Sequence, residues 1–104
     1  MLVESLELHG YHVLSARDGE QGVRAFTQGD KAIRLVIVDM IMPVLDGLAT
    51  IIKLRSLRPD IRIIAVTGFL DSERFRKLEA LQVDAVVSKP YDMNNLLEKI
   101  KEII

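Results

Sequence analysis

The sequence predicts an α/β sandwich built on a mostly parallel sheet. Short apolar runs rich in branched residues alternate along the chain with longer segments of helical period. The clearest run, Leu35–Asp39, has four consecutive apolar residues and no polar alternation, which indicates a strand covered on both faces. Helices that separate such strands are typical of a layered α/β domain.

The first third of the chain contains two expected helices and one expected strand. Met1–Leu8 has helical spacing and ends before Gly10, as the last turn of a helix often does. His12–Ala16 is a short candidate strand. Asp18 can cap a second helix, which should stop near Gly29.

The middle of the chain contains the Leu35–Asp39 strand and a helix that follows it. Asp46 can cap this helix, which should end before Pro59. Its expected inner face includes Leu48, Ile51, Ile52 and Leu57.

The last third continues the alternation. Ile61–Val66 is a buried strand, and a helical spacing follows at Phe75, Leu78 and Leu81. Ala85–Ser88 is the next strand, and Asp92 caps the final helix. The whole chain therefore predicts four strands and about five helices.

Composition narrows the class of protein. A chain of 104 residues suits one domain, and a net charge of −1 provides no bulk attraction to nucleic acid or to a membrane surface. There are no cysteines, and no apolar run approaches the roughly 20 residues that span a bilayer. Glu4 and Glu7 lie where an export signal would be apolar. We therefore expect a small soluble domain located in the cytoplasm.

Polar side chains follow three of the expected strands. They are Asp39, Thr67 and Lys89: a carboxylate, a hydroxyl and an ammonium. Because parallel strands end at the same edge of a sheet, we expect these three residues to lie close together. An aspartate there can attack phosphorus, while a hydroxyl and an ammonium can bind the oxygens of the transferred group.

Three segments of the chain resemble one known family. They are LVIVDMIMPVLDG at 35–47, IIAVTG at 63–68 and SKPY at 88–91. The pairs at 10–11 and 16–19 also fall where that family places similar residues. In order and spacing, the whole chain resembles the receiver domain of two-component response regulators.

The resemblance implies a fold, a reaction and a set of partners. The fold would be flavodoxin-like, with a doubly wound sheet. Asp39 would accept a phosphoryl group from a sensor histidine kinase, while Thr67 would hydrogen-bond that group and Lys89 would pair with it. Mg²⁺ is the expected cofactor, with Asp39 and the backbone carbonyl of Ile41 among its ligands. Lys89-Pro90 would be a cis peptide, and a surface including the last helices would change its affinity for a downstream protein.

The sequence also departs from the family pattern. The family begins with a strand that ends in two acidic metal ligands, whereas this sequence starts within the expected first helix. We therefore expect residues 1–104 to be an N-terminally incomplete receiver domain with weakened Mg²⁺ binding and reduced activity. A second copy could fill the gap in the sheet. Val86 replaces a switching aromatic residue, and Gln82 replaces a glycine.

Two other functions remain as alternatives. One is a phosphorylation-independent module for protein interaction or dimerisation. The other is a phosphohydrolase with an aspartate nucleophile, which the sequence disfavours because Ile41 occupies the position of that class's second aspartate. A signalling module rather than an enzyme is therefore expected, and this chain alone should not bind nucleic acid.

Overall fold

The computed structural model describes residues 6–11, 18–28, 33–40, 47–68 and 72–104. Three strands form the sheet within these ranges: β1 (Leu35–Asp39), β2 (Arg62–Thr67) and β3 (Ala85–Ser88). All neighbours are parallel, in the order β1-β2-β3. The predicted parallel α/β architecture is confirmed, and the expected fourth strand at His12–Ala16 lies outside the described residues.

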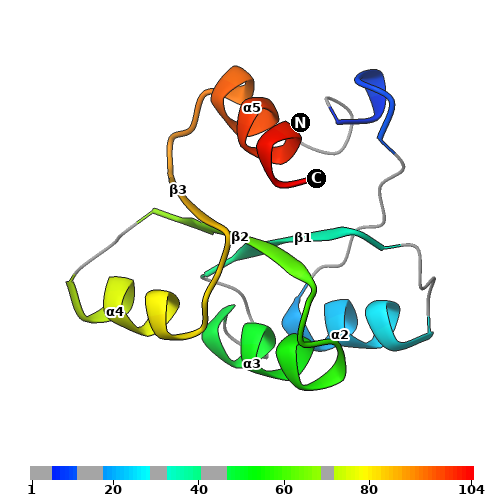
Figure 1. Cartoon of the computed structure of the whole chain (residues 1–104), viewed down its shortest axis with the longest axis vertical. Coiled ribbons are helices and arrows are strands. Elements are labelled where there is room, and N and C mark those ends of the chain that lie inside the picture. Colours follow the sequence, from blue (N-terminus) through cyan, green and yellow to red (C-terminus); the bar gives the residue numbers. More distant parts are fainter. Residues whose placement is uncertain (1–5, 12–17, 29–32, 41–46, 69–71) are drawn as a thin grey trace.

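Helices cover both faces of this sheet (Figure 1). On one face lie α2 (Gly19–Gln28), α3 (Gly47–Leu57) and α4 (Ser72–Ala80). On the other face lie α5 (Met93–Ile103) and the short helical turn Leu6–Leu8. A strand with helices above and below buries the side chains on both of its faces, which explains the continuous apolar runs.

Alternate residues of each strand contribute to two separate hydrophobic cores. From β2, Ile63 and Ala65 pack in the core beneath α3 and α4, while Ile64 and Val66 pack against α5. Helix α3 contributes Ile51 and Leu54 to the first core, and α5 contributes Leu96, Leu97 and Ile100 to the second. β2 is therefore the central strand of both cores.

The expected inner face of α3 was wrong for two residues. Ile52 is 55% exposed and Leu57 is 50% exposed, whereas Ile51 and Leu54 are buried. Successive residues of a helix point about 100° apart, so Ile52 turns away from the face that Ile51 and Leu54 share. The sequence is apolar on both sides of this helix, and only its packing against the sheet selects the buried side.

Side-chain caps begin two of the helices as predicted. Asp18 Oδ1 accepts the backbone N–H of Gln21 at 2.8 Å before α2, and Asp92 Oδ1 accepts that of Asn94 at 2.9 Å before α5. The predicted cap Asp46 lies outside the described residues. Over the parts of the chain that the structure describes, no helix has the length and apolar character needed to cross a membrane.

Candidate functional site

The three predicted site residues lie at the carboxyl edge of the sheet. Asp39 ends β1, Thr67 ends β2, and Lys89 directly follows β3. The register pairs Asp39 with Val66 and Thr67 with Ser88. Thr67 therefore lies one residue beyond Asp39 along the strands, and Lys89 lies one residue beyond Thr67. The prediction that parallel strands bring them to one edge is confirmed.

Asp39 and Lys89 form a direct ion pair. Lys89 Nζ donates to Asp39 Oδ2 at 2.6 Å. The Asp39 side chain is 39% exposed and that of Lys89 is 43% exposed, so a reagent in solution can reach the pair. A carboxylate that is accessible and already faces an ammonium can react with an electrophile whose negative charge the ammonium then offsets.

Thr67 occupies the position between these two charges along the sheet. Its residue is only 1% exposed, although it lies at the end of a strand. The Thr67 carbonyl accepts the backbone N–H of Lys89 at 2.8 Å, which extends the β2–β3 ladder by one residue. The backbone of Lys89 is thus fixed by the residue whose hydroxyl was predicted to bind the phosphoryl group.

The stem of Lys89 passes beside Gly68. A Cβ atom on Gly68 would lie 3.9 Å from Lys89 Cδ and 4.0 Å from Lys89 Cβ, which is ordinary van der Waals distance. The next peptide bond, Lys89-Pro90, is cis as the sequence comparison implied. The lysine therefore reaches Asp39 by crossing the end of β2.

The backbone next to Asp39 is fixed by the contacts of Met40, the residue that follows it. The N–H of Met40 donates to the carbonyl of Val66 at 2.8 Å, and Met40 is buried. Gly47, the first residue of α3, donates its N–H to the Met40 carbonyl at 3.4 Å. The start of α3 therefore packs directly against the chain next to Asp39.

The described residues contain only one of the two predicted Mg²⁺ ligands, Asp39. Among the described residues, no group of three or more His, Cys, Asp or Glu side chains is arranged to hold a metal ion. Ile41, the other predicted ligand, lies outside the described ranges. Mg²⁺ is normally held by one or two carboxylates with waters, and Asp39 Oδ2 already accepts from Lys89.

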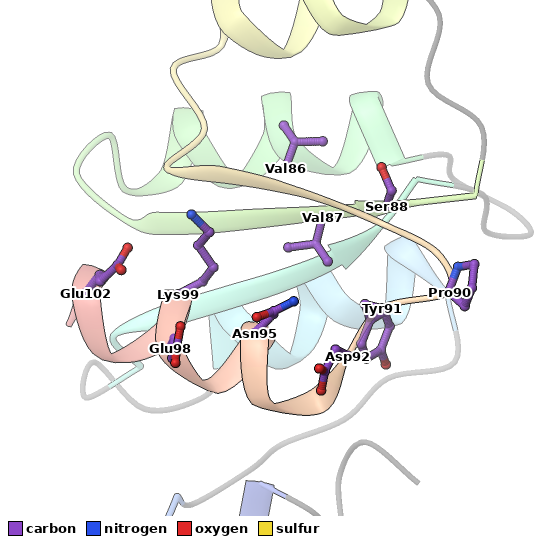
Figure 2. A pocket seen from close by; sticks show the side chains of 10 residues that line it. All are labelled: Val86, Val87, Ser88, Pro90, Tyr91, Asp92, Asn95, Glu98, Lys99 and Glu102. Atoms are coloured by element: carbon purple, nitrogen blue, oxygen red, sulfur yellow. The ribbon is translucent and has the colours of Figure 1, made fainter.

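A groove of about 410 Å³ lies between β3 and α5, close to this edge (Figure 2). Its lining includes Pro90 and Tyr91, which directly follow Lys89. The charged residues that line it are Asp92, Glu98, Lys99 and Glu102. None of the three predicted site residues lines it.

Sequence reasoning did not single out this groove. Asn95, Glu98 and Glu102 are spaced by three and four residues, so they share one side of α5, and this spacing was a usable signal. The role of Gly47 was also missed, although the Asp-Gly pair at 46–47 was part of the family motif. A motif shows that a glycine occurs but does not show what it contacts.

Comparisons with known sequences agree with this geometry. The family model described as "Response regulator receiver domain" matches residues 1–101. The response regulator receiver protein CpdR of Brucella abortus is 27% identical over 99% of this chain and 84% of its own length. The sensor kinase CckA of the same species is 28% identical over 98% of this chain, which spans only 11% of the kinase.

Solved structures show the same fold. A CheY-like receiver domain protein from Methanospirillum hungatei has a TM-score of 0.91 and 31% identity, covering 97% of this chain and 79% of its own. The response regulator TrrA from Thermotoga maritima, solved in complex with Mg²⁺-BeF, has a TM-score of 0.84 and 31% identity, covering 99% and 86%. The chain therefore belongs to the response regulator receiver domain family of two-component signalling and has its CheY-like, flavodoxin-type fold.

Proposed function

We propose that this receiver domain accepts a phosphoryl group on Asp39 from a sensor histidine kinase. The observation that carries the proposal is the 2.6 Å contact between Lys89 Nζ and Asp39 Oδ2 at an accessible sheet edge. A carboxylate oxygen of Asp39 attacks the phosphorus of a phosphohistidine, and the P–N bond breaks. The imidazole leaves with the electron pair of that bond and takes up a proton, and an acyl phosphate forms on Asp39.

The residues around Asp39 suit the product of this transfer. A phosphoryl group adds close to two negative charges and three acceptor oxygens. The Lys89 ammonium offsets part of that charge, and the Thr67 hydroxyl donates to a phosphoryl oxygen. The protein acts as a signalling module in this scheme, since each transfer loads one group onto one aspartate.

The groove between β3 and α5 is the proposed contact surface for a downstream protein. Lys89 pairs with Asp39 and is followed in the chain by Pro90 and Tyr91, which line the groove wall. A phosphoryl group on Asp39 draws the Lys89 ammonium toward new acceptors. The backbone that follows Lys89 then shifts the groove between two shapes with different affinity for the partner.

Phosphorylation is tested with a small phosphodonor and intact-mass measurement. The chain is incubated with acetyl phosphate, with and without Mg²⁺, and should gain the mass of one phosphoryl group. Asp39→Asn should gain none, while Asp92→Asn, which changes an aspartate of the α5 cap, should label like the parent protein. Labelling of Asp39→Asn, or none of the parent chain at any donor concentration, would overturn the proposal.

A second candidate function, dimerisation, is favoured by the position of β1 at one end of the sheet that the described strands form. Among the described strands β1 pairs only with β2, yet Leu35 and Ile37 pack with one core and Val36 and Val38 with the other. An apolar strand covered on both faces at a sheet edge is a site for pairing with another chain. We propose a second copy of this chain as that partner.

The dimer is tested by light scattering over a range of protein concentrations, before and after treatment with the phosphodonor. A mass that rises to twice that of one chain, whether or not Asp39 is labelled, supports the second candidate. A single-chain mass at every concentration excludes it. The labelling result is independent of this measurement, so the two candidates are separated.

A further inference from the structure

Gly47 leaves no space between α3 and the backbone beside Asp39. A Cβ atom built on Gly47 would lie 2.5 Å from Met40 Cα and 2.8 Å from Met40 Sδ. It would also lie 3.0 Å from the carbonyl oxygen of Asp39. Real Cβ atoms essentially never approach another heavy atom within 3.0 Å, so even an alanine here must displace one of the two segments.

Both segments are fixed by other contacts. Met40 is buried, and its N–H donates to the carbonyl of Val66 at 2.8 Å. Helix α3 is anchored through Ile51 and Leu54, which are fully buried in the core beneath the sheet. Because packed interiors transmit strain rather than absorb it, a methyl group at position 47 would be felt at Met40.

Asp39 is the residue through which this displacement reaches the site. It directly precedes Met40, and its carbonyl oxygen is itself one of the atoms that the methyl group would approach. Its carboxylate meets Lys89 Nζ at 2.6 Å, a distance that a small backbone shift would change. The geometry points to Gly47 as a positioning residue that sets where the Asp39 carboxylate lies relative to the Lys89 ammonium.

The functional meaning of this inference rests on the proposed phosphoryl transfer to Asp39. Gly47 contacts neither the donor nor the reacting oxygen and acts only through Met40 and Asp39. Misplacement of a reacting group by about 1 Å can lower a rate about 100-fold. Gly47 therefore keeps the Asp39 carboxylate at the position from which it can accept the phosphoryl group.

Gly68 provides a matched control at the same edge. A Cβ atom on Gly68 would meet Lys89 only at 3.9 Å and 4.0 Å, so alanine fits there without displacement. Leu78 provides a second control, because it is buried in α4 in the same core as Met40, and its truncation destabilises the fold without adding an atom between α3 and Met40. Gly68→Ala tests the effect of an added methyl group at this edge, and Leu78→Ala tests the effect of a general loss of stability. An effect seen only in Gly47→Ala is then due to a changed position of the Asp39 carboxylate.

The first test follows the ion pair by NMR without any phosphodonor. Asp39→Asn removes the charge that Lys89 faces and should displace the Lys89 ε-methylene signal in the parent protein. The same substitution should displace it by less than half as much in a Gly47→Ala background, and by the full amount in Gly68→Ala and Leu78→Ala backgrounds. A full displacement in the Gly47→Ala background would overturn the inference.

The second test measures the rate of labelling by acetyl phosphate. Gly47→Ala should lower the limiting rate of the folded protein about tenfold or more, while Leu78→Ala should leave that rate unchanged. An unchanged limiting rate in Gly47→Ala would also overturn the inference. If the parent chain takes no phosphoryl group, the proposed function fails, and the NMR comparison still decides the role of Gly47.

Should Gly47→Ala fail to fold, the double variant Met40→Ala/Gly47→Ala replaces it in both tests. This variant removes the 2.8 Å sulfur contact and keeps the crowding at Met40 Cα and the Asp39 carbonyl. It is compared with Met40→Ala alone, in which Gly47 remains. Equal Lys89 signals and equal labelling rates in these two proteins would count against a positioning role.

Discussion

The side chain of Lys89 crosses the end of β2 to reach Asp39, 50 residues earlier in the chain, at 2.6 Å. Because β2 lies between β1 and β3, the two residues belong to strands that are not neighbours. The lysine stem passes beside the exposed glycine at position 68, where a Cβ atom would meet it only at ordinary van der Waals distance. The ion pair thus joins the two outer strands of the described sheet at its carboxyl edge.

Removing the ammonium should affect reactivity far more than stability. We predict that Lys89→Met lowers the rate of Asp39 labelling by acetyl phosphate about 100-fold, because the developing charge loses its main partner. The free energy of unfolding should change by less than about 1 kcal/mol, since the pair is exposed to solvent and screened. Labelling is followed by intact mass and stability by urea denaturation.

Lys101→Met is the control for this experiment, because Lys101 lies in the last turn of α5. It should leave the labelling rate unchanged. A labelling rate in Lys89→Met equal to that of Lys101→Met would contradict the assigned role of Lys89.

Loss of the α5 cap should destabilise the protein by about 1 kcal/mol. Asp92 Oδ1 accepts the N–H of Asn94 at 2.9 Å, and Asp92→Ala leaves that donor without its side-chain partner. Asp92→Asn keeps an acceptor oxygen and should recover most of the loss. The two variants are compared by urea denaturation, and equal midpoints for both would show that the cap does not stabilise α5.

Local patterns in the sequence predicted most of the fold. Apolar runs located the described strands, and the caps Asp18 and Asp92 were found because a cap depends on residues two or three positions away. The meeting of Asp39 and Lys89 was predictable as well, since parallel strands end at one edge.

Contacts between distant segments could not be predicted in the same way. The buried side of α3 was misassigned because Ile52 is as apolar as Ile51, and only tertiary packing distinguishes them. Arg55 is a charged residue on a helix, a type that is usually solvated, but its guanidinium donates to the carbonyls of Pro59 and Gln82 at 2.8 Å and 2.7 Å. No periodicity connects Arg55 with a carbonyl 27 residues away.

Asp84 should be a main determinant of stability at the opposite edge of the sheet. Its Oδ2 accepts the N–H of buried Ile63 at 2.8 Å, and its own N–H donates to the Ile63 carbonyl at 2.8 Å. Arg62 and Arg55 lie 3.5 Å and 4.0 Å from its carboxylate oxygens. Asp84→Ala should therefore cost about 2 kcal/mol, because a buried donor loses its acceptor.

The comparison with Asp84→Asn separates the hydrogen bond from the charge. The amide oxygen of asparagine can still accept from Ile63, so this variant should lose about 1 kcal/mol or less. Both are measured by urea denaturation at fixed ionic strength. A loss in Asp84→Asn as large as that in Asp84→Ala would show that the charge, rather than the hydrogen bond, carries the stabilisation.

Gln82 closes α4 in a conformation that favours glycine. Its φ is 57°, its N–H donates to Glu79 at 2.9 Å, and the N–H of Val83 donates to Leu78 at 3.5 Å. These two bonds form a Schellman motif, which usually has glycine at the left-handed position. A side chain there costs about 1–2 kcal/mol.

Gln82→Gly should therefore stabilise the protein by about 0.5–1 kcal/mol, since the relief of strain exceeds the extra freedom of glycine in the unfolded chain. The Gln82 carbonyl that accepts from Arg55 is a backbone group and is kept. Gln82→Ala retains the Cβ atom and should not reproduce the gain. The midpoint of urea denaturation should rise for glycine only, and an equal rise for alanine would mean that the glutamine side chain, not the backbone conformation, is the source of strain.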